Sequence, residues 1–117
     1  MVYNFALPPL LAHSILHGDT KALTNWAKTL ALPSNKVCFF NFTASHDGVG
    51  LRPVKGILSD EEIDFLVKQV KDHGGLVTFR TEEDGSQSVY ELNCSYIDIL
   101  SHPDEEVMIR IKRMLIS

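Results

Sequence analysis

Hydrophobic positions recur at helical spacing in several stretches of the chain, with short apolar runs between them. The clearest helix begins after Ser59, because a serine followed three residues later by Glu62 is the pattern of a capping box. We expect it to end at Gly74 and Gly75, as helices with left-handed glycine caps do. Its predicted apolar stripe consists of Ile63, Leu66, Val67 and Val70.

Three further helices are predicted from the same signals. The first runs from Pro9 to about His17, since proline suits a first turn and Gly18 follows. The second is capped by Asp19 or Thr20, and the last is capped by Ser101 with Asp104. The apolar faces expected for the last two are Leu23, Trp26, Ala27 and Leu30, and Val107, Ile111, Met114 and Leu115.

Strands are predicted from the apolar runs. Residues 37–42 are rich in aromatic and β-branched side chains, which is typical of a strand buried on both faces of a parallel sheet, so Phe39, Phe40 and Phe42 are expected in the core with Trp26. Residues 2–5 form a strand stub. Residues 76–80 and 88–92 flank Asp84-Gly85, a hairpin turn signal, and with the preceding helix they predict a small αββ unit.

Composition narrows the class of protein. The chain has 117 residues, 44% of them hydrophobic, which is enough for the core of one domain. A net charge of -4 argues against nucleic-acid partners, which select basic patches. No segment approaches the roughly 20 apolar residues that span a bilayer, and the N-terminal stretch lacks the basic start of a signal peptide. We therefore expect a cytoplasmic protein in which Cys38 and Cys94 are free thiols.

His46 and Asp47 directly follow the predicted strand 37–42, at the edge of a parallel sheet where function collects. On pattern alone, an ordinary Asp-Gly turn is the commoner explanation. The alternative is a fixed carboxylate that stabilises a cationic transition state such as an oxocarbenium ion, with an imidazole beside it to hydrogen-bond a polyol. In that case Gly48 and Gly50 would let a sugar ring approach the backbone.

Other polar residues carry weaker signals. His13 and His17 share a helix face, but no carboxylate or cysteine at a matching spacing completes a metal site, so packing or surface roles are favoured. His73 and His102 are expected in solvent. A second polar group lies at the end of the strand 88–92 and beyond it: Tyr90, Glu91, Asn93 and Tyr96.

These motifs resemble those of the α-amylase superfamily of (β/α)8-barrel enzymes, in the sucrose phosphorylase branch. "VYNFALPPLLAHSILHGD" is similar to the sixth barrel strand and the helices after it. "FFNFTASHDGVGLRPVKGILSDEEIDFLV" is similar to the seventh strand with its active-site loop, and "GSQSVYELNCSY" to the mobile loop of a small inserted subdomain. The resemblance covers essentially the whole chain.

The resemblance implies an α/β fold that is a segment of a TIM barrel, from about strand 6 to helix 7. Residues 1–50 would be barrel with the active-site loop, residues 51–100 the inserted αββ subdomain, and residues 101–117 the start of barrel helix 7. Because a whole barrel takes about 250 residues, this chain is expected to be a fragment that exposes barrel-facing apolar surface, with self-association or partial disorder as a consequence.

The resemblance also assigns roles to five residues. Asp47 would be the transition-state stabiliser and His46 would hydrogen-bond the glucosyl ring. Tyr90 and Glu91 match positions that shape the acceptor and phosphate site, where the second is typically Gln in sucrose phosphorylases, and Arg52 is more similar to relatives acting on glucosylglycerate or a phosphorylated sucrose. The nucleophile and the acid/base of retaining chemistry would precede the first residue.

The function expected from the resemblance is therefore a fragment of a retaining phosphorylase, inactive alone, that transfers an α-glucosyl group between a small α-glucoside and inorganic phosphate. Such an enzyme needs no metal or organic cofactor. Two alternatives stay open: a fragment of an α-amylase-type glycoside hydrolase, in which water replaces phosphate, and a non-catalytic remnant or interaction protein.

Overall fold

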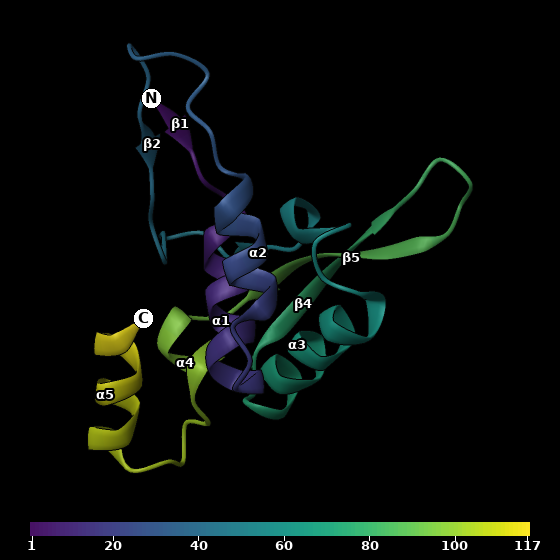
Figure 1. The fold of residues 1–117 in the computed structure, drawn as a ribbon. Coiled ribbons are helices and arrows are strands. Elements are labelled where there is room, and N and C mark those ends of the chain that lie inside the picture. The colour runs from purple at the N-terminus through teal and green to yellow at the C-terminus, as the bar shows by residue number, and fades with distance from the viewer.

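The computed structural model describes residues 1–117. It contains five helices, five strands and one short 3-10 helix, η1 (Arg52–Val54). The helices and strands are β1 (Val2–Tyr3), α1 (Leu7–His17), α2 (Lys21–Thr29), β2 (Phe39–Phe40), β3 (Val49–Gly50), α3 (Asp60–Asp72), β4 (Leu76–Thr81), β5 (Gln87–Asn93), α4 (Tyr96–Leu100) and α5 (Val107–Ile116). Figure 1 shows α1, α3 and α4 around the central strands, with three extensions at the periphery. No helix combines the length and the apolar character needed to cross a membrane.

The predicted capping box starts α3. The Ser59 hydroxyl accepts from the backbone N–H of Glu62 at 3.2 Å, and the Glu62 carboxylate accepts from the backbone N–H of Ser59 at 2.8 Å. The two bonds satisfy donors that a helix N-terminus otherwise leaves free. At the other end, Gly74 takes a left-handed conformation with φ of 83°, and the four stripe residues are buried. The capping box, the apolar stripe and the left-handed Gly74 are confirmed, whereas Gly75 does not have a positive φ.

Helix α1 begins at Leu7, two residues before the predicted start, with both prolines in its first turn. It ends at His17 and is capped by Gly18, which has φ of 75°, as predicted. Helix α2 follows after Thr20, whose side chain makes no capping bond; Asp19 instead accepts from the backbone N–H of Lys21 at 2.7 Å. Trp26 is half-buried and packs against the edge of the core.

The central sheet is antiparallel, with β5 between β3 and β4. Val49 lies opposite Leu92 and Val77 opposite the same leucine, so Leu92 is fully buried between two neighbouring strands. The hairpin of β4 and β5 turns at Gly85, with φ of 82°, and its tip projects away from the helices (Figure 1). The predicted αββ unit is therefore confirmed, and β3 adds a third strand to it.

Strands β1 and β2 form a separate parallel pair, joined by hydrogen bonds from Val2 N–H to the Cys38 carbonyl and from Asn4 N–H to the Phe40 carbonyl. The predicted strand 37–42, buried on both faces, is wrong in two respects. Only Phe39–Phe40 is a strand, and Phe40 is 45% exposed. The physical reason is that the two-stranded pair of β1 and β2 has no layer of the hydrophobic core packed on it, so its aromatic side chains contact mainly one another.

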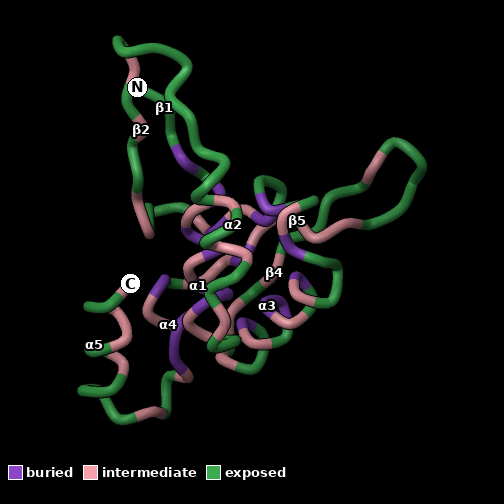
Figure 2. The backbone as a smooth tube through the Cα atoms, in the orientation of Figure 1, coloured by how far each residue is buried: buried purple, intermediate pink, exposed green.

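The core consists of 15 buried hydrophobic residues contributed by α1, β3, the η1 region, α3, β5 and α4 (Figure 2). Residues from both predicted regions, 1–50 and 51–100, share it. Helix α5 contributes none: it starts at Val107, not at a Ser101–Asp104 cap, and Ser101 is instead buried after α4. That predicted cap is wrong because α4 takes up residues 96–100 and an irregular segment separates the two helices.

Candidate functional site

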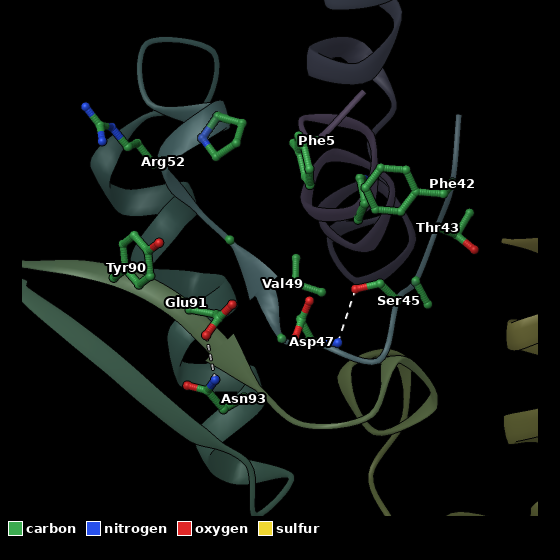
Figure 3. Close-up of a pocket in the computed structure, with 15 residues that line it drawn as sticks. Phe5, Phe42, Thr43, Ser45, Asp47, Val49, Arg52, Tyr90, Glu91 and Asn93 are labelled. Atoms are coloured by element: carbon green, nitrogen blue, oxygen red, sulfur yellow. Dashed lines mark hydrogen bonds between the residues drawn. The ribbon is translucent and has the colours of Figure 1, made fainter. Parts of the chain in front are cut away.

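A cavity of about 610 Å³ lies between the loop after β2 and the outer face of β5 (Figure 3). Phe5 and Phe42 line one side, and polar groups from three different segments line the rest. Four of the five residues that the sequence singled out for substrate chemistry lie around this cavity: Asp47, Arg52, Tyr90 and Glu91. They are up to 44 positions apart in the sequence, and only folding brings them together.

The loop 41–48 presents Asp47. Its backbone N–H donates to the Ser45 hydroxyl at 3.2 Å, which bends the loop back toward the cavity (Figure 3). Gly48 then passes so close to β5 that a Cβ atom there would lie 2.6 Å from the Leu92 carbonyl oxygen and 2.8 Å from Cγ of Glu91. Gly48 therefore serves close packing of the loop on β5, whereas an added Cβ at Gly50 would meet open space.

Strand β5 carries the opposite wall. Glu91 lies opposite Gly50 of β3, and the Tyr90 carbonyl accepts from the backbone N–H of Leu51 at 2.9 Å. Asn93 also lines the cavity, and its side-chain amide donates to the Glu91 carboxylate at 2.8 Å. Arg52 is the first residue of η1, two positions after the end of β3, so its guanidinium comes from the third segment (Figure 3).

His46 is not among the residues that line this cavity. Its side chain is 91% exposed, and Nε2 lies 3.5 Å from Oδ1 of Asp47, whose own side chain is 71% exposed. His46 and Asp47 together line a second, shallower hollow of about 520 Å³ beside Asn93 and Cys94. The His46–Asp47 pair thus lies between the main cavity and this hollow, and Asp47 lines both.

Two other polar residues near the site, Tyr96 and Cys94, are in largely apolar surroundings. Tyr96 is buried, its hydroxyl donates to the Pro8 carbonyl at 2.9 Å, and burial raises its pKa. Tyr96 therefore joins α4 to α1 and does not extend the polar group of β5. Burial, with a smaller effect of Asp98, raises the pKa of Cys94 to about 11, so this thiol stays protonated near neutral pH.

The histidines outside the loop also differ from one another. His13 is almost fully buried on α1, stacks on His17 with ring centroids 5.0 Å apart, and lies 3.6 Å from Glu62, in agreement with the packing role. His73 was expected in solvent, which is wrong: it is half-buried, with Nδ1 2.7 Å from the Asp98 carbonyl oxygen and its ring against His102. No group of three or more histidine, cysteine or acidic side chains is arranged to hold a metal ion.

The chemistry of the main cavity follows from its lining. It holds two carboxylates, one guanidinium, a phenol and an amide, with aromatic side chains at one end. Carboxylates accept hydrogen bonds from hydroxyl groups, amides both accept from them and donate to them, and a guanidinium pairs with a carboxylate or phosphate. Such a lining suits a polyhydroxylated ligand that carries one anionic group. The polar residues of β5 were predicted from the sequence. The part played by Phe5 and Phe42 in the cavity wall was missed, because Phe42 was predicted to be in the core and Phe5 only to belong to the strand stub 2–5.

Comparison with known proteins identifies relatives along the whole chain. The chain is 42% identical over 117 residues to the glucosylglycerate phosphorylase of Escherichia coli (strain K12), and the match covers 100% of this chain and 21% of the relative. It is 47% identical to the glucosylglycerate phosphorylase of Allomeiothermus silvanus, and this match covers 98% of the chain and 21% of the relative. It is 33% identical to the sucrose phosphorylase of Agrobacterium vitis, and this match covers 92% of the chain and 23% of the relative. The chain thus spans about a fifth of the length of these relatives. No family model matches it.

Among solved structures, the chain is similar to the sucrose 6F-phosphate phosphorylase of Thermoanaerobacter thermosaccharolyticum, with a TM-score of 0.71 and 20% identity, covering 95% of this chain and 23% of that one. At that identity the likeness concerns the fold, which is mixed α/β. The predicted resemblance to the sucrose phosphorylase branch of the α-amylase superfamily is confirmed: the chain is similar throughout to a segment of glycoside phosphorylases.

Proposed function

We propose that this chain is the acceptor-side segment of a retaining glycoside phosphorylase that transfers an α-glucosyl group between glucosylglycerate and inorganic phosphate. The observation that carries the proposal is the gathering of Asp47, Arg52, Tyr90 and Glu91 around one cavity. The choice of substrate is supported by the relatives, since those named glucosylglycerate phosphorylase are 42–47% identical and those named sucrose phosphorylase are 30–33% identical.

Asp47 is the transition-state stabiliser in this proposal. As the C1–O bond to the leaving group breaks, positive charge develops on the glucosyl ring, and a fixed carboxylate beside it lowers the energy of that state. The bond from the Asp47 backbone N–H to Ser45 and the close packing of Gly48 on β5 support this role, because both restrict the backbone that carries the carboxylate. His46 would hydrogen-bond the glucosyl ring from the neighbouring hollow.

Arg52 and Glu91 would bind the acceptor. Glycerate carries one carboxylate and hydroxyl groups; a guanidinium pairs with the former and a carboxylate accepts from the latter. Tyr90 would pack beside them. The arrangement therefore suits an acceptor that is anionic at one end and a hydroxyl donor at the other, which is the chemistry that distinguishes glycerate from fructose.

The covalent steps need two further carboxyls about 5 Å apart, a nucleophile and an acid/base. In the proposed reaction the nucleophile displaces glycerate, whose oxygen takes the proton of the acid/base. A phosphate oxygen, which gives its proton back to the acid/base, then displaces the nucleophile at C1. We propose that both groups belong to the rest of a longer protein, and that the 117-residue chain alone does not catalyse phosphorolysis.

The decisive experiment replaces the matching segment of the Escherichia coli relative by these 117 residues. We expect phosphate-dependent release of glucose 1-phosphate from glucosylglycerate, with little from sucrose. Asp47→Asn should lower the rate about a hundredfold to a thousandfold, whereas Asp64→Asn, an exposed acid on α3, should leave it unchanged. An inactive exchanged enzyme beside an active parent would contradict the proposal and favour the non-catalytic alternative.

Hydrolysis is the second candidate, and Glu91 favours it. A carboxylate on the acceptor side repels phosphate, whereas it does not repel water. The same assay separates the two functions, because a hydrolase would release free glucose at a rate indifferent to phosphate. Glu91→Gln would then change little in the hydrolase, but in the phosphorylase it should lower the KM for phosphate while raising that for glycerate.

A further inference from the structure

Thr78 lies on β4, outside the cavity, yet its side chain is connected to the cavity wall. Its hydroxyl donates to Oδ1 of Asn93 at 2.5 Å, and Nδ2 of Asn93 donates to Oε2 of Glu91 at 2.8 Å. The dashed line between Asn93 and Glu91 in Figure 3 marks the second of these bonds. The three side chains thus form a continuous relay from the solvent-exposed strand to the acceptor side of the site.

The direction of this relay is fixed by chemistry. An ionised carboxylate only accepts hydrogen bonds, so the amide group of Asn93 that faces Glu91 must be its NH₂. The amide oxygen of Asn93 then faces Thr78, and the threonine hydroxyl must be the donor there. Removing the hydroxyl would leave the amide oxygen without this partner and would free the Asn93 side chain to rotate.

The pairing of β4 with β5 brings the three residues of the relay close together. Thr78 lies directly opposite Glu91 in the register of β4 and β5, and the register shifts immediately afterwards, between Thr78 and Phe79. Gly48 leaves the space that the relay needs on the other side: an added Cβ there would lie 2.8 Å from Cγ of Glu91 and 2.9 Å from Nδ2 of Asn93. The relay is thus held between β4 and the loop that carries Asp47.

We infer that Thr78 is a positioning residue for acceptor binding, acting through Asn93 to fix the carboxylate of Glu91. With Oε2 held by Asn93, Oε1 is the oxygen left to accept from an acceptor hydroxyl. This inference rests on the proposed function, because it takes Glu91 to contact the acceptor. It assigns to a residue outside the cavity an effect on the affinity for the acceptor and not on the chemical step.

The first test uses the 117-residue chain itself. Thr78→Val removes the hydroxyl at nearly constant shape, and Thr78→Ser keeps it. By NMR, we expect the side-chain amide protons of Asn93 to exchange with water about three- to tenfold faster in Thr78→Val than in wild type, and at the wild-type rate in Thr78→Ser. Equal exchange in all three would overturn the relay, whatever the function of the protein.

The second test uses the segment-exchanged enzyme in the synthetic direction. Thr78→Val should raise the KM for glycerate about three- to tenfold while kcat and the KM for glucose 1-phosphate stay within about twofold, and Thr78→Ser should restore the wild-type values. A fall in kcat with an unchanged KM for glycerate would overturn the inference, since general loosening of the sheet would produce that pattern.

A double-mutant cycle completes the test. In a Glu91→Ala background, Thr78→Val should change kcat/KM for glycerate less than about 1.5-fold, because the carboxylate that Asn93 positions is then absent. An undiminished effect would show that Thr78 acts by another route and would overturn the inference. Failure of the proposed function would give a different result. The segment-exchanged enzyme would lack phosphorolysis before any substitution, while the hydrogen exchange of the Asn93 side-chain amide would still be faster in Thr78→Val.

Discussion

The packed body of the molecule and its aromatic flank contain similar residues in very different surroundings. The body comprises α1, α3, α4 and the sheet of β3, β5 and β4, and its side chains such as Leu66 and Leu92 have no exposed surface. The aromatic flank comprises four side chains on and next to β1 and β2: Tyr3, Phe5, Phe40 and Phe42. Its rings contact one another, yet Tyr3 is 57% and Phe5 59% exposed.

The difference shows that hydrophobicity alone does not bury a residue. Leu92 is covered because β5 has a neighbour on each side and helices α1, α3 and α4 nearby, whereas β1 and β2 have only one another. Helix α5 shows the same difference. Its contacts with the body include the ion pair of Arg110 with Asp98, the hydrogen bond from Arg113 to Ser101 and the packing of Met114 against the core, while Leu115 remains 80% exposed. In the flank and in α5, no element of the 117 residues covers the exposed apolar side chains.

The largest expected effect comes from truncating a core residue of the body. Leu66→Ala removes a fully buried side chain from α3 and should lower the free energy of unfolding by about 2–5 kcal/mol. Leu115→Ala on α5 makes the same change at an exposed position and should cost less than about 0.5 kcal/mol. Urea denaturation followed by circular dichroism measures both. Equal losses would contradict the contrast between body and α5.

The next effect concerns the contact between the Asp47 loop and β5. Gly48→Ala forces a Cβ to within 2.6 Å of a backbone oxygen, and the backbone of a central strand yields poorly, so we expect a loss of about 1–3 kcal/mol. Gly50→Ala, two residues along the same chain segment, meets open space and should be nearly neutral. If the two variants unfold at the same urea concentration, the loop does not press on β5 as described.

A smaller effect on stability is expected in the aromatic flank. Phe40→Asp should cost less than about 1.5 kcal/mol, because it loses ring contacts but no burial in the core. It should nevertheless reduce self-association in sedimentation experiments, since exposed aromatic patches promote contact between copies. Thr24→Asp, which adds the same charge on the exposed face of α2, serves as the control. A wild-type chain that is monomeric at high concentration would contradict the prediction.

The last prediction concerns the pH dependence of the body. Burial lowers the pKa of His13 below its ordinary value of 6.5, and the nearby Glu62 opposes this while His17 adds to it and Asp19 opposes it. The unfolded chain therefore takes up the proton first as pH falls, so stability present above about pH 6.5 is lost below it. His13→Leu, which cannot be protonated, should show a smaller loss of stability between pH 7 and pH 5. An unchanged slope would show that His13 does not contribute.

Local signals in the sequence determined most of the secondary structure. The Ser59–Glu62 capping box, the left-handed glycines Gly18 and Gly74, and the Asp84-Gly85 turn act between residues close in the chain, so their outcome does not depend on distant partners. The sequence alone was likewise enough to identify the polar candidates for the site and their resemblance to phosphorylase motifs: Asp47, Arg52, Tyr90 and Glu91.

Only the tertiary structure decided which apolar and polar residues have partners. The run at 37–42 predicts a buried strand, but burial depends on the elements that pack on the faces of that strand, and a single segment cannot specify them. Tyr96 belongs to the core because Pro8, 88 positions away, accepts its hydrogen bond. The contact of Gly48 with β5 and the Thr78–Asn93–Glu91 relay also join segments remote in sequence, so their existence follows from packing and register.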